Sequence, residues 1–227
     1  MNNYIKIKNL TKKYEKNKTI KVLNDISFNF EPGKTYSITG PSGSGKSTLL
    51  NLLSLIDNPT TGSIEISSNK IKLNNKVEND LIRAKKIGII YQDKNLLSDF
   101  TALENVYLPN LLITKEKQKS VDLAKKLIKN VGMSTRINYF PNELSGGENQ
   151  RIAIARALIN DPDIILADEP TGSLDFDNAK LIFKILFNLK SKKRIIIFAT
   201  HNRYFADMSD CKLSLINGKI STINDRN

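Results

Sequence analysis

Short apolar runs separated by amphipathic stretches predict an α/β protein. Short continuous apolar runs are typical of strands buried in a parallel sheet, and apolar residues at every third or fourth position are typical of helices. The predicted strands cover residues 4–8, 22–30, 34–39, 63–66, 70–73, 86–91, 163–170, 195–200, 212–216 and 219–223. The predicted helices cover residues 46–56, 101–108, 115–131, 149–160 and 177–189.

The segments between these elements carry their own signals. Residues 10–15 are polar, which predicts a link between the first two strands. Gly132 directly follows the helix 115–131 and suits its C′ position. Asn217-Gly218 separates the last two strands, and this dipeptide predicts a hairpin with a type I′ turn.

The stretch 40–48 fits the phosphate-binding loop pattern G-x-x-x-x-G-K-[ST]. Its glycines let backbone N–H groups curl around a phosphate chain, and the next helix adds the positive end of its dipole. Lys46 is expected to place its charge between the β- and γ-phosphates, and Ser47 to ligate Mg²⁺. The alternative is an accidental Gly/Ser-rich turn, which the strand before and the helix after disfavour. The predicted nucleotide contacts are Gly40, Pro41, Ser42, Gly43, Ser44, Gly45, Lys46, Ser47 and Thr48.

Polar residues follow three of the apolar strands. Asp168 and Glu169 end one of them, and two adjacent carboxylates there are costly unless they meet a cation or do chemistry. Beside a phosphate-binding loop, Asp168 is expected to hold Mg²⁺ and Glu169 to act as general base on water. Gln92 and His201 end two further strands, and the ends of parallel strands form ligand sites. We therefore predict that His201 contacts the γ-phosphate.

Two further features have two interpretations each. Tyr14 either stacks on a nucleotide base or is an ordinary tyrosine at the surface. The run Leu144-Ser145-Gly146-Gly147-Glu148 precedes a helix. It is either a capping box or a second anion site with bare N–H groups.

Composition excludes some classes of protein. The 227 residues are 40% hydrophobic, and no apolar run approaches the ~18 residues that span a bilayer, which predicts a soluble globular protein. The N-terminus lacks secretory features, and the lone Cys211 is expected to be a small core residue of a cytoplasmic protein. The net charge of +12 is compatible with anionic lipid or with a general abundance of Lys and Asn. No block of five Lys or Arg occurs, so no nucleic-acid partner is expected.

Together these motifs resemble the nucleotide-binding subunits of ATP-binding cassette (ABC) transporters over essentially the whole chain. The ordered set is Tyr14, the Walker A loop 40–48, the Q-loop residue Gln92, the signature 144–148, the Walker B acids Asp168 and Glu169, the D-loop residues Ser173, Leu174 and Asp175, and the switch residue His201. The resemblance implies a P-loop NTPase core of RecA-like type with an antiparallel β subdomain and a helical subdomain. It implies one ABC ATPase domain over 1–227, with 1–92 and 151–227 as core and 93–150 as helical subdomain.

The resemblance also implies a mechanism. Two copies would dimerise head to tail, with ATP between the Walker A loop of one copy and the signature of the other. Lys46, Gln92, Glu169 and His201 would form the catalytic set. Membrane subunits would dock near Gln92 and the helical insertion, at the cytoplasmic face of the inner membrane. The resemblance further implies that Ser47, Gln92 and Asp168 ligate Mg²⁺. It also implies that ATP contacts Ser145, Gly146, Gly147 and Glu148. Glu148 stands where the family commonly has Gln.

A finer resemblance links the chain to the ATPases of lipoprotein-releasing systems. It is carried by the residues 91–92, 96–106, 167–172 and 199–202. Macrolide and peptide exporters and a cell-division ATPase share much of it, so these remain alternatives.

Two other classes are less well supported by the sequence. ABC ATPases that act on DNA or ribosomes usually carry a coiled-coil insertion or a second cassette, and the chain has neither. A GTPase needs an Asn-Lys-x-Asp element, and the nearest match, residues 75–78, lies in the wrong part of the chain.

Overall fold

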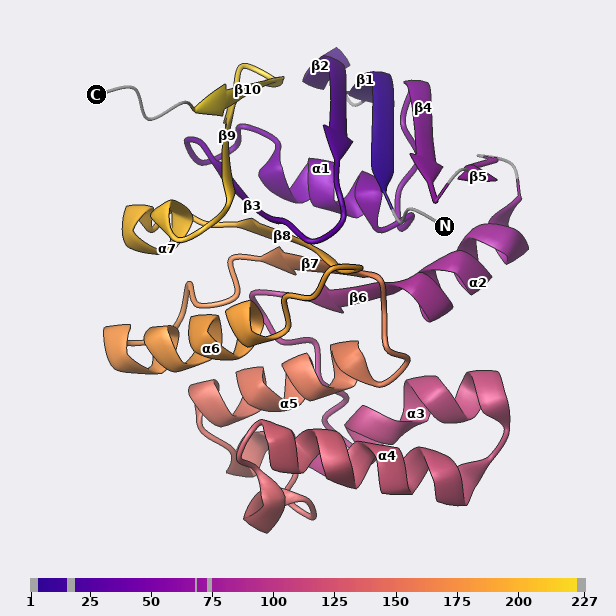
Figure 1. Ribbon diagram of the computed structural model, residues 1–227, viewed down its shortest axis with the longest axis vertical. Helices are drawn as coiled ribbons and strands as arrows, with labels where there is room; N and C mark the ends of the chain where they lie inside the picture. The colour runs from indigo at the N-terminus through magenta and orange to yellow at the C-terminus, as the bar shows by residue number, and fades with distance from the viewer. Residues whose placement is uncertain (1–3, 16–18, 68, 73–74, 224–227) are drawn as a thin grey trace.

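The computed structural model describes residues 4–15, 19–67, 69–72 and 75–223. It stacks an antiparallel sheet, a mainly parallel sheet and a layer of helices (Figure 1). The helix α1 lies between the two sheets, and α5 and α6 cover the opposite face of the parallel sheet (Figure 1). The helical bounds are α1 (Lys46–Leu53), α2 (Lys76–Lys86), α3 (Ala102–Thr114), α4 (Lys117–Asn130), η1 (Ser134–Arg136), η2 (Pro141–Glu143), α5 (Gly146–Leu158), α6 (Phe176–Asn188) and α7 (Arg203–Asp207).

The larger sheet has the strand order β10-β9-β3-β8-β7-β6. All its strands run parallel except β10, which forms an antiparallel hairpin with β9. The parallel strands therefore end at one edge, on the left in Figure 1. The bounds are β3 (Thr35–Thr39), β6 (Ile87–Ile90), β7 (Ile164–Asp168), β8 (Ile195–Ala199), β9 (Cys211–Ile216) and β10 (Lys219–Ile223).

The two faces of the larger sheet pack into two different hydrophobic cores. Along β7, Ile164 and Leu166 belong to the core around α1 and the antiparallel sheet. Ile165 and Ala167, between and after them, belong to the core formed with the helical layer. A strand buried on both faces has no polar alternation, which explains its continuous apolar run.

The smaller sheet has the order β2-β1-β4-β5 and is antiparallel. The predicted polar link over residues 10–15 is wrong, because this segment continues β1 and pairs with β2 as far as Glu15 opposite Thr19. Register shifts and the positive φ of Asn9 and Asp25 (49° and 55°) interrupt the alternation that marks a strand in the sequence. The bounds are β1 (Ile5–Glu15), β2 (Thr19–Phe30), β4 (Thr61–Ile66) and β5 (Asn69–Lys70). The predicted strand 70–73 is thus displaced, and residue 73 lies outside the described residues.

Several helical segments differ from the prediction. The short helices η1, η2 and α7 are additional, and so is α2, which is mostly polar and has few apolar residues to mark it. Its start is capped by Asn75, whose side chain accepts a hydrogen bond from the N–H of Glu78. The helix α3 continues through Pro109 to Thr114, because its packing against α4 and α5 outweighs the hydrogen bond that proline removes.

The predicted turn residues are confirmed. Gly132 has a φ of 72° at the C′ position of α4. Asn217 and Gly218 have φ values of 51° and 71°, as a type I′ turn requires. The N–H of Asn24 in β2 donates to the carbonyl of Gly218, so the hairpin is attached to the smaller sheet. No helix in the described ranges is both long and apolar enough to cross a bilayer.

Replacing Gly218 by Ala is expected to lower the free energy of unfolding by about 2–4 kcal/mol. A Cβ there would lie 2.6 Å from the carbonyl oxygen of Val22, in addition to the strain of a positive φ. Gly132→Ala is the matched control, since its φ is 72° but, apart from its chain neighbours, none of the described residues has a heavy atom within 4 Å of the added Cβ. It should cost only about 1 kcal/mol. Urea unfolding measures both, and equal losses would contradict the steric argument.

Candidate ATP-binding site

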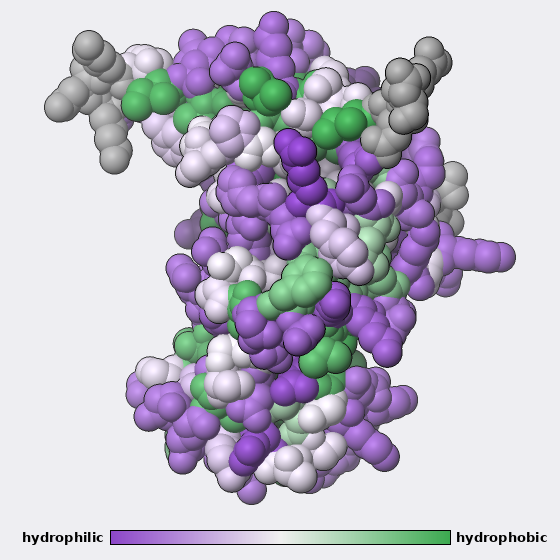
Figure 2. Space-filling view, turned by 90° about the vertical axis from the view of Figure 1, so that its left-hand side faces the viewer, coloured by the Kyte–Doolittle hydropathy of each residue, from purple (hydrophilic) through white to green (hydrophobic). Residues whose placement is uncertain are grey.

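The carboxyl ends of four parallel strands bring the predicted site residues to one edge of the sheet. The Walker A loop follows β3, Gln92 follows β6, Asp168 ends β7 with Glu169 directly after it, and His201 follows β8. One cavity of about 580 Å³ at this edge is lined by Ser42, Gln92, Glu169 and His201, with the D-loop residue Leu174. Figure 2 shows this face of the molecule, where hydrophilic residues prevail and hydrophobic side chains form small separate patches.

The Walker A loop has the close packing that its glycines predict. Gly40 has a φ of 153°, and a Cβ on it would lie 2.2 Å from the carbonyl oxygen of Leu215, so no other residue fits. Lys46 is only 7% exposed, and its Nζ donates to the carbonyls of Gly40 and Pro41 at 3.0 and 3.1 Å. The first turn of α1 has no acidic residue, so its N–H groups and dipole favour an anion. The exposed residues of the loop are Pro41, Ser42, Gly43 and Ser47, Gly40 and Thr48 are half-buried, and Ser44 and Gly45 are buried.

Tyr14 lies at the end of β1, beside the Walker A helix. Its hydroxyl donates to Oδ2 of Asp57 at 3.0 Å and also interacts with Thr48 of α1. Lys12 lies 4.8 Å from the ring centroid and 2.6 Å from Oδ1 of Asp57. Burial opposes ionisation of Asp57, but hydrogen bonds from Lys12, Tyr14 and the N–H of Asn58 lower its pKa. The ring is 39% exposed next to the loop, and stacking on a base stays a prediction.

Glu169 is held in a strained conformation beside His201. Its φ of 44° lies in the left-handed region, which is rare for a residue other than glycine and often marks a functional site. The N–H of Glu169 donates to the carbonyl of Ala199 at 3.1 Å. Its Oε2 accepts from the backbone N–H of His201 at 3.3 Å, and Oε1 lies 3.1 Å from His201 Nε2. The carboxylate is therefore fixed at the cavity wall with one oxygen beside the imidazole.

The residues predicted for Mg²⁺ fit a hard cation. Oδ1 of Asp168 is buried and has no hydrogen-bond partner among the described residues, so a cation would satisfy it. Ser47 offers an exposed hydroxyl in the first turn of α1. Among the described residues no group of three or more His, Cys, Asp or Glu could hold a metal ion, so a cation bound at Asp168 would need oxygen ligands from outside the chain, such as phosphate or water. The third predicted ligand, Gln92, is exposed and lies against Gly172, with Nε2 3.2 Å from the position of a Cβ there.

The signature lies outside the cavity that Glu169 and His201 line. Ser145 caps α5, where its hydroxyl accepts from the N–H of Glu148 and its own N–H donates to Glu148 Oε2 at 2.8 Å. This backbone hydrogen bond is the main reason that the pKa of Glu148 is lowered. The capping-box interpretation is thus confirmed, while the anion-binding interpretation stays a prediction. Gly147 is buried against α6, where a Cβ would lie 3.0 Å from Oδ1 of Asn178.

The D-loop joins the cavity to α6. Ser173 is exposed and its Oγ accepts a hydrogen bond from Lys94 Nζ at 2.6 Å. Leu174 lines the cavity, and Asp175 caps α6 by accepting from the N–H groups of Asp177 and Asn178. Hydrogen bonds from Asn178 are the largest cause of the lowered pKa of Asp175.

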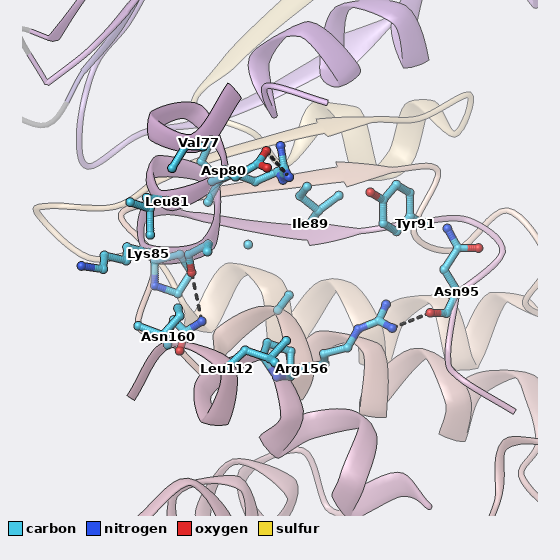
Figure 3. A pocket seen from close by; sticks show the side chains of 18 residues that line it. Val77, Asp80, Leu81, Lys85, Ile89, Tyr91, Asn95, Leu112, Arg156 and Asn160 are labelled. Atoms are coloured by element: carbon cyan, nitrogen blue, oxygen red, sulfur yellow. Dashed lines mark hydrogen bonds and ion pairs between the residues drawn. The ribbon is translucent and has the colours of Figure 1, made fainter. Parts of the chain in front are cut away.

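A second cavity of about 700 Å³ is not predicted by the sequence analysis. It lies between α2, β6, α3 and α5, and Figure 3 shows its lining side chains. We call it the α2–α3 groove. Its rim exposes Val77, Leu81 and Leu112, of which Leu112 is 68% exposed. In the sequence this groove is indicated only by Val77 and Leu81, two apolar residues four positions apart in α2, a helix that the sequence analysis does not predict.

Comparison with known proteins gives the family. The ABC transporter family model matches residues 23–172. The lipoprotein-releasing system ATP-binding protein LolD of Wigglesworthia glossinidia brevipalpis is 46% identical over 97% of this chain and 98% of its own length. The protein of the same name from Rickettsia bellii is 41% identical over 97% of this chain and 98% of its own length.

Solved structures agree with the sequence relatives. A dimeric structure of the ATP-binding cassette MJ0796, in a post-hydrolysis state with ADP and Pi, has a TM-score of 0.91 and 36% identity. The match covers 98% of this chain and 99% of that one. Together with the ordered motifs at one sheet edge, these matches show that the chain belongs to the ABC transporter family and is one of its ATP-hydrolysing cassettes.

Proposed function

We propose that this chain is the ATPase subunit of a lipoprotein-releasing transporter and works at the cytoplasmic face of the inner membrane. The observation that carries the ATPase part is the Glu169 carboxylate, fixed beside His201 in a cavity that the Walker A residue Ser42 also lines. The cargo rests on near full-length similarity to LolD proteins, which favours lipoprotein release over macrolide or peptide export and cell division. A role on DNA or ribosomes has no supporting feature.

In this proposal the Walker A loop binds the triphosphate. The N–H groups at the start of α1 face the phosphates, and Lys46 exchanges its contacts with two loop carbonyls for phosphate oxygens. Asp168, Ser47 and Gln92 would hold Mg²⁺, which would neutralise phosphate charge as the bond to the leaving group breaks. Tyr14 would stack on the base.

Hydrolysis requires a base for the attacking water. Glu169 is suited to accept that proton, because it lines the cavity, the N–H of His201 fixes one carboxylate oxygen, and the other lies 3.1 Å from His201 Nε2. His201 Nε2, 3.1 Å from the carboxylate, would contact the γ-phosphate. Gln92 lies on the same cavity and would orient the water or the cation.

We propose that the active unit is a homodimer. The signature of one chain does not line its own Glu169 cavity, which supports donation of Ser145, Gly146, Gly147 and Glu148 to the partner's nucleotide. Related cassettes have been solved as dimers. The negative charge of ATP would attract both the Walker A loop of one chain and the signature of the other, and hydrolysis would weaken this interaction between the chains. The membrane subunits would dock in the α2–α3 groove, whose exposed apolar rim suits a helix of a partner.

Lys46→Ala is expected to weaken ATP binding about 10- to 100-fold, because one charge-assisted phosphate contact is lost. Isothermal titration calorimetry measures the change, with Lys184→Ala on the exposed face of α6 as the control lysine. Unchanged affinity in Lys46→Ala, in protein that unfolds at the wild-type temperature, would remove the phosphate assignment.

Glu169→Gln is expected to lower turnover about 10²- to 10⁴-fold while ATP still binds, because the amide keeps the shape but accepts no proton. Size-exclusion chromatography with ATP should show a stable dimer of this variant. Glu116→Gln, on the exposed start of α4, is the matched control and should turn over normally. If Glu169→Gln hydrolysed ATP at the wild-type rate, the general-base assignment would be wrong.

The cargo is tested by purifying tagged Glu169→Gln chain from detergent-solubilised native membranes in the presence of ATP. Slow hydrolysis should keep the closed complex together, and mass spectrometry should then find integral membrane subunits together with lipoproteins. Recovery of ribosomal or DNA-bound proteins without membrane subunits would reject the transport function. Membrane subunits with peptides but no lipoproteins would reject the proposed cargo alone.

A further inference from the structure

We propose that Lys94 is a positioning residue that fastens the D-loop to the segment after β6, so that a partner in the α2–α3 groove sets the geometry beside Glu169. The proposal rests on the proposed function, because it assumes that the groove receives a membrane subunit. It assigns a role to two residues, Lys94 and Arg156, that lie outside the motifs.

The backbone around Lys94 is held in an unfavourable shape. Lys94 and Asn95 have φ values of 60° and 46°, so two consecutive residues other than glycine lie in the left-handed region. Asparagine tolerates this conformation, but lysine does not favour it. Such a pair persists only where neighbouring groups hold it.

Arg156 of α5 is the group that holds this turn. Its guanidinium donates to the carbonyl of Lys94 at 2.7 Å and also to the carbonyl of Asn95. Figure 3 shows the Arg156 side chain extending to Asn95 at one side of the α2–α3 groove, with Tyr91 above them. The planar fork of arginine presents its two N–H groups to the two carbonyls in a fixed geometry. Arg156, Asn95 and Tyr91 all line the groove, so a helix docked there would touch this clamp.

Lys94 points away from the clamp to the D-loop. Its Nζ donates to Ser173 Oγ at 2.6 Å, and the side chain is half-buried. The residue before Ser173 is Gly172, whose N–H donates to the carbonyl of Glu169 at 3.0 Å. The residue after it, Leu174, lies against the signature, 3.4 Å from the position of a Cβ on Gly146.

Hydrogen bonds and the covalent chain together connect the groove to Glu169. Arg156 bonds to the carbonyls of Lys94 and Asn95, and the Lys94 side chain bonds to Ser173. Gly172, the neighbour of Ser173, bonds through its N–H to the carbonyl of Glu169. If a docked partner displaces Arg156, the turn at Lys94 and Asn95 moves with it. Lys94 then displaces the D-loop through its hydrogen bond to Ser173. A coupling element of this kind requires a second arrangement, which loss of the Arg156 contacts would allow.

The test uses the complete transporter purified with its membrane subunits, and follows ATP turnover against ATP concentration. Lys94→Met and Ser173→Ala should each lower kcat about tenfold, the size expected for one charge-assisted hydrogen bond, and leave KM for ATP nearly unchanged. The double variant should be no worse than either single one, because both remove the same bond. Lys94→Arg should restore most of the rate, and the surface control Lys184→Met should behave as wild type.

Every other outcome contradicts one part of the proposal, or the proposed function on which it rests. Wild-type kcat in Lys94→Met, or losses that multiply in the double variant, would overturn the Lys94–Ser173 connection while the proposed function stands. An equal loss of rate in the isolated chain and in the complex would show that the bond only supports the D-loop and does not report on the groove. A wild-type complex that does not hydrolyse ATP would reject the proposed function itself. Thermal unfolding of each variant excludes loss of folding as the cause.

Discussion

The parallel pairing of β3, β8, β7 and β6 is the constraint on which the site depends. Parallel strands that are hydrogen-bonded in register must end together, and here Asp168 pairs with Ala199, so the Walker B acids lie beside the strand that leads to His201. Both faces of these strands are packed into separate cores. A shift of register would therefore disturb two cores as well as the site, which makes the edge a rigid base for the loops that carry the site residues.

At this edge the structure holds a cationic and an anionic side chain that are suited to bind the phosphates and the cation of a nucleotide. Lys46 is nearly buried and satisfies its ammonium with carbonyls of its own loop. Oδ1 of Asp168 is buried without a hydrogen-bond partner in the described part of the chain. A buried carboxylate oxygen without a hydrogen-bond partner is costly, and a buried ammonium is stabilised better by an anion than by neutral carbonyls. A divalent cation would supply the missing partner of Asp168, and phosphates would supply the anion for Lys46.

The sequence predicts the site better than it predicts its surroundings. Motifs such as residues 40–48 are local, so their spacing alone identifies them, and strands buried on both faces give unbroken apolar runs. The second half of β1 is not predicted, because bulges near Asn9 break its alternation. The groove is not predicted either, because four elements build it and α2, one of them, is mostly polar. The contact of Lys94 with Ser173 joins residues 79 positions apart, which no local pattern encodes.

The helix α5 connects the signature to the α2–α3 groove, two parts of the molecule that the sheet does not join. Its first turn carries the signature at Ser145, and its buried Gln150 lies 3.5 Å from the carbonyl of Tyr91, at the end of β6. Arg156, three turns further, holds the strained turn at Lys94 and lines the groove. A helix is stiff along its axis, so a partner that tilts α5 at Arg156 must also move Ser145. The surface proposed for the second nucleotide and the surface proposed for the membrane subunits are thus two ends of one rigid element, and neither can move without the other.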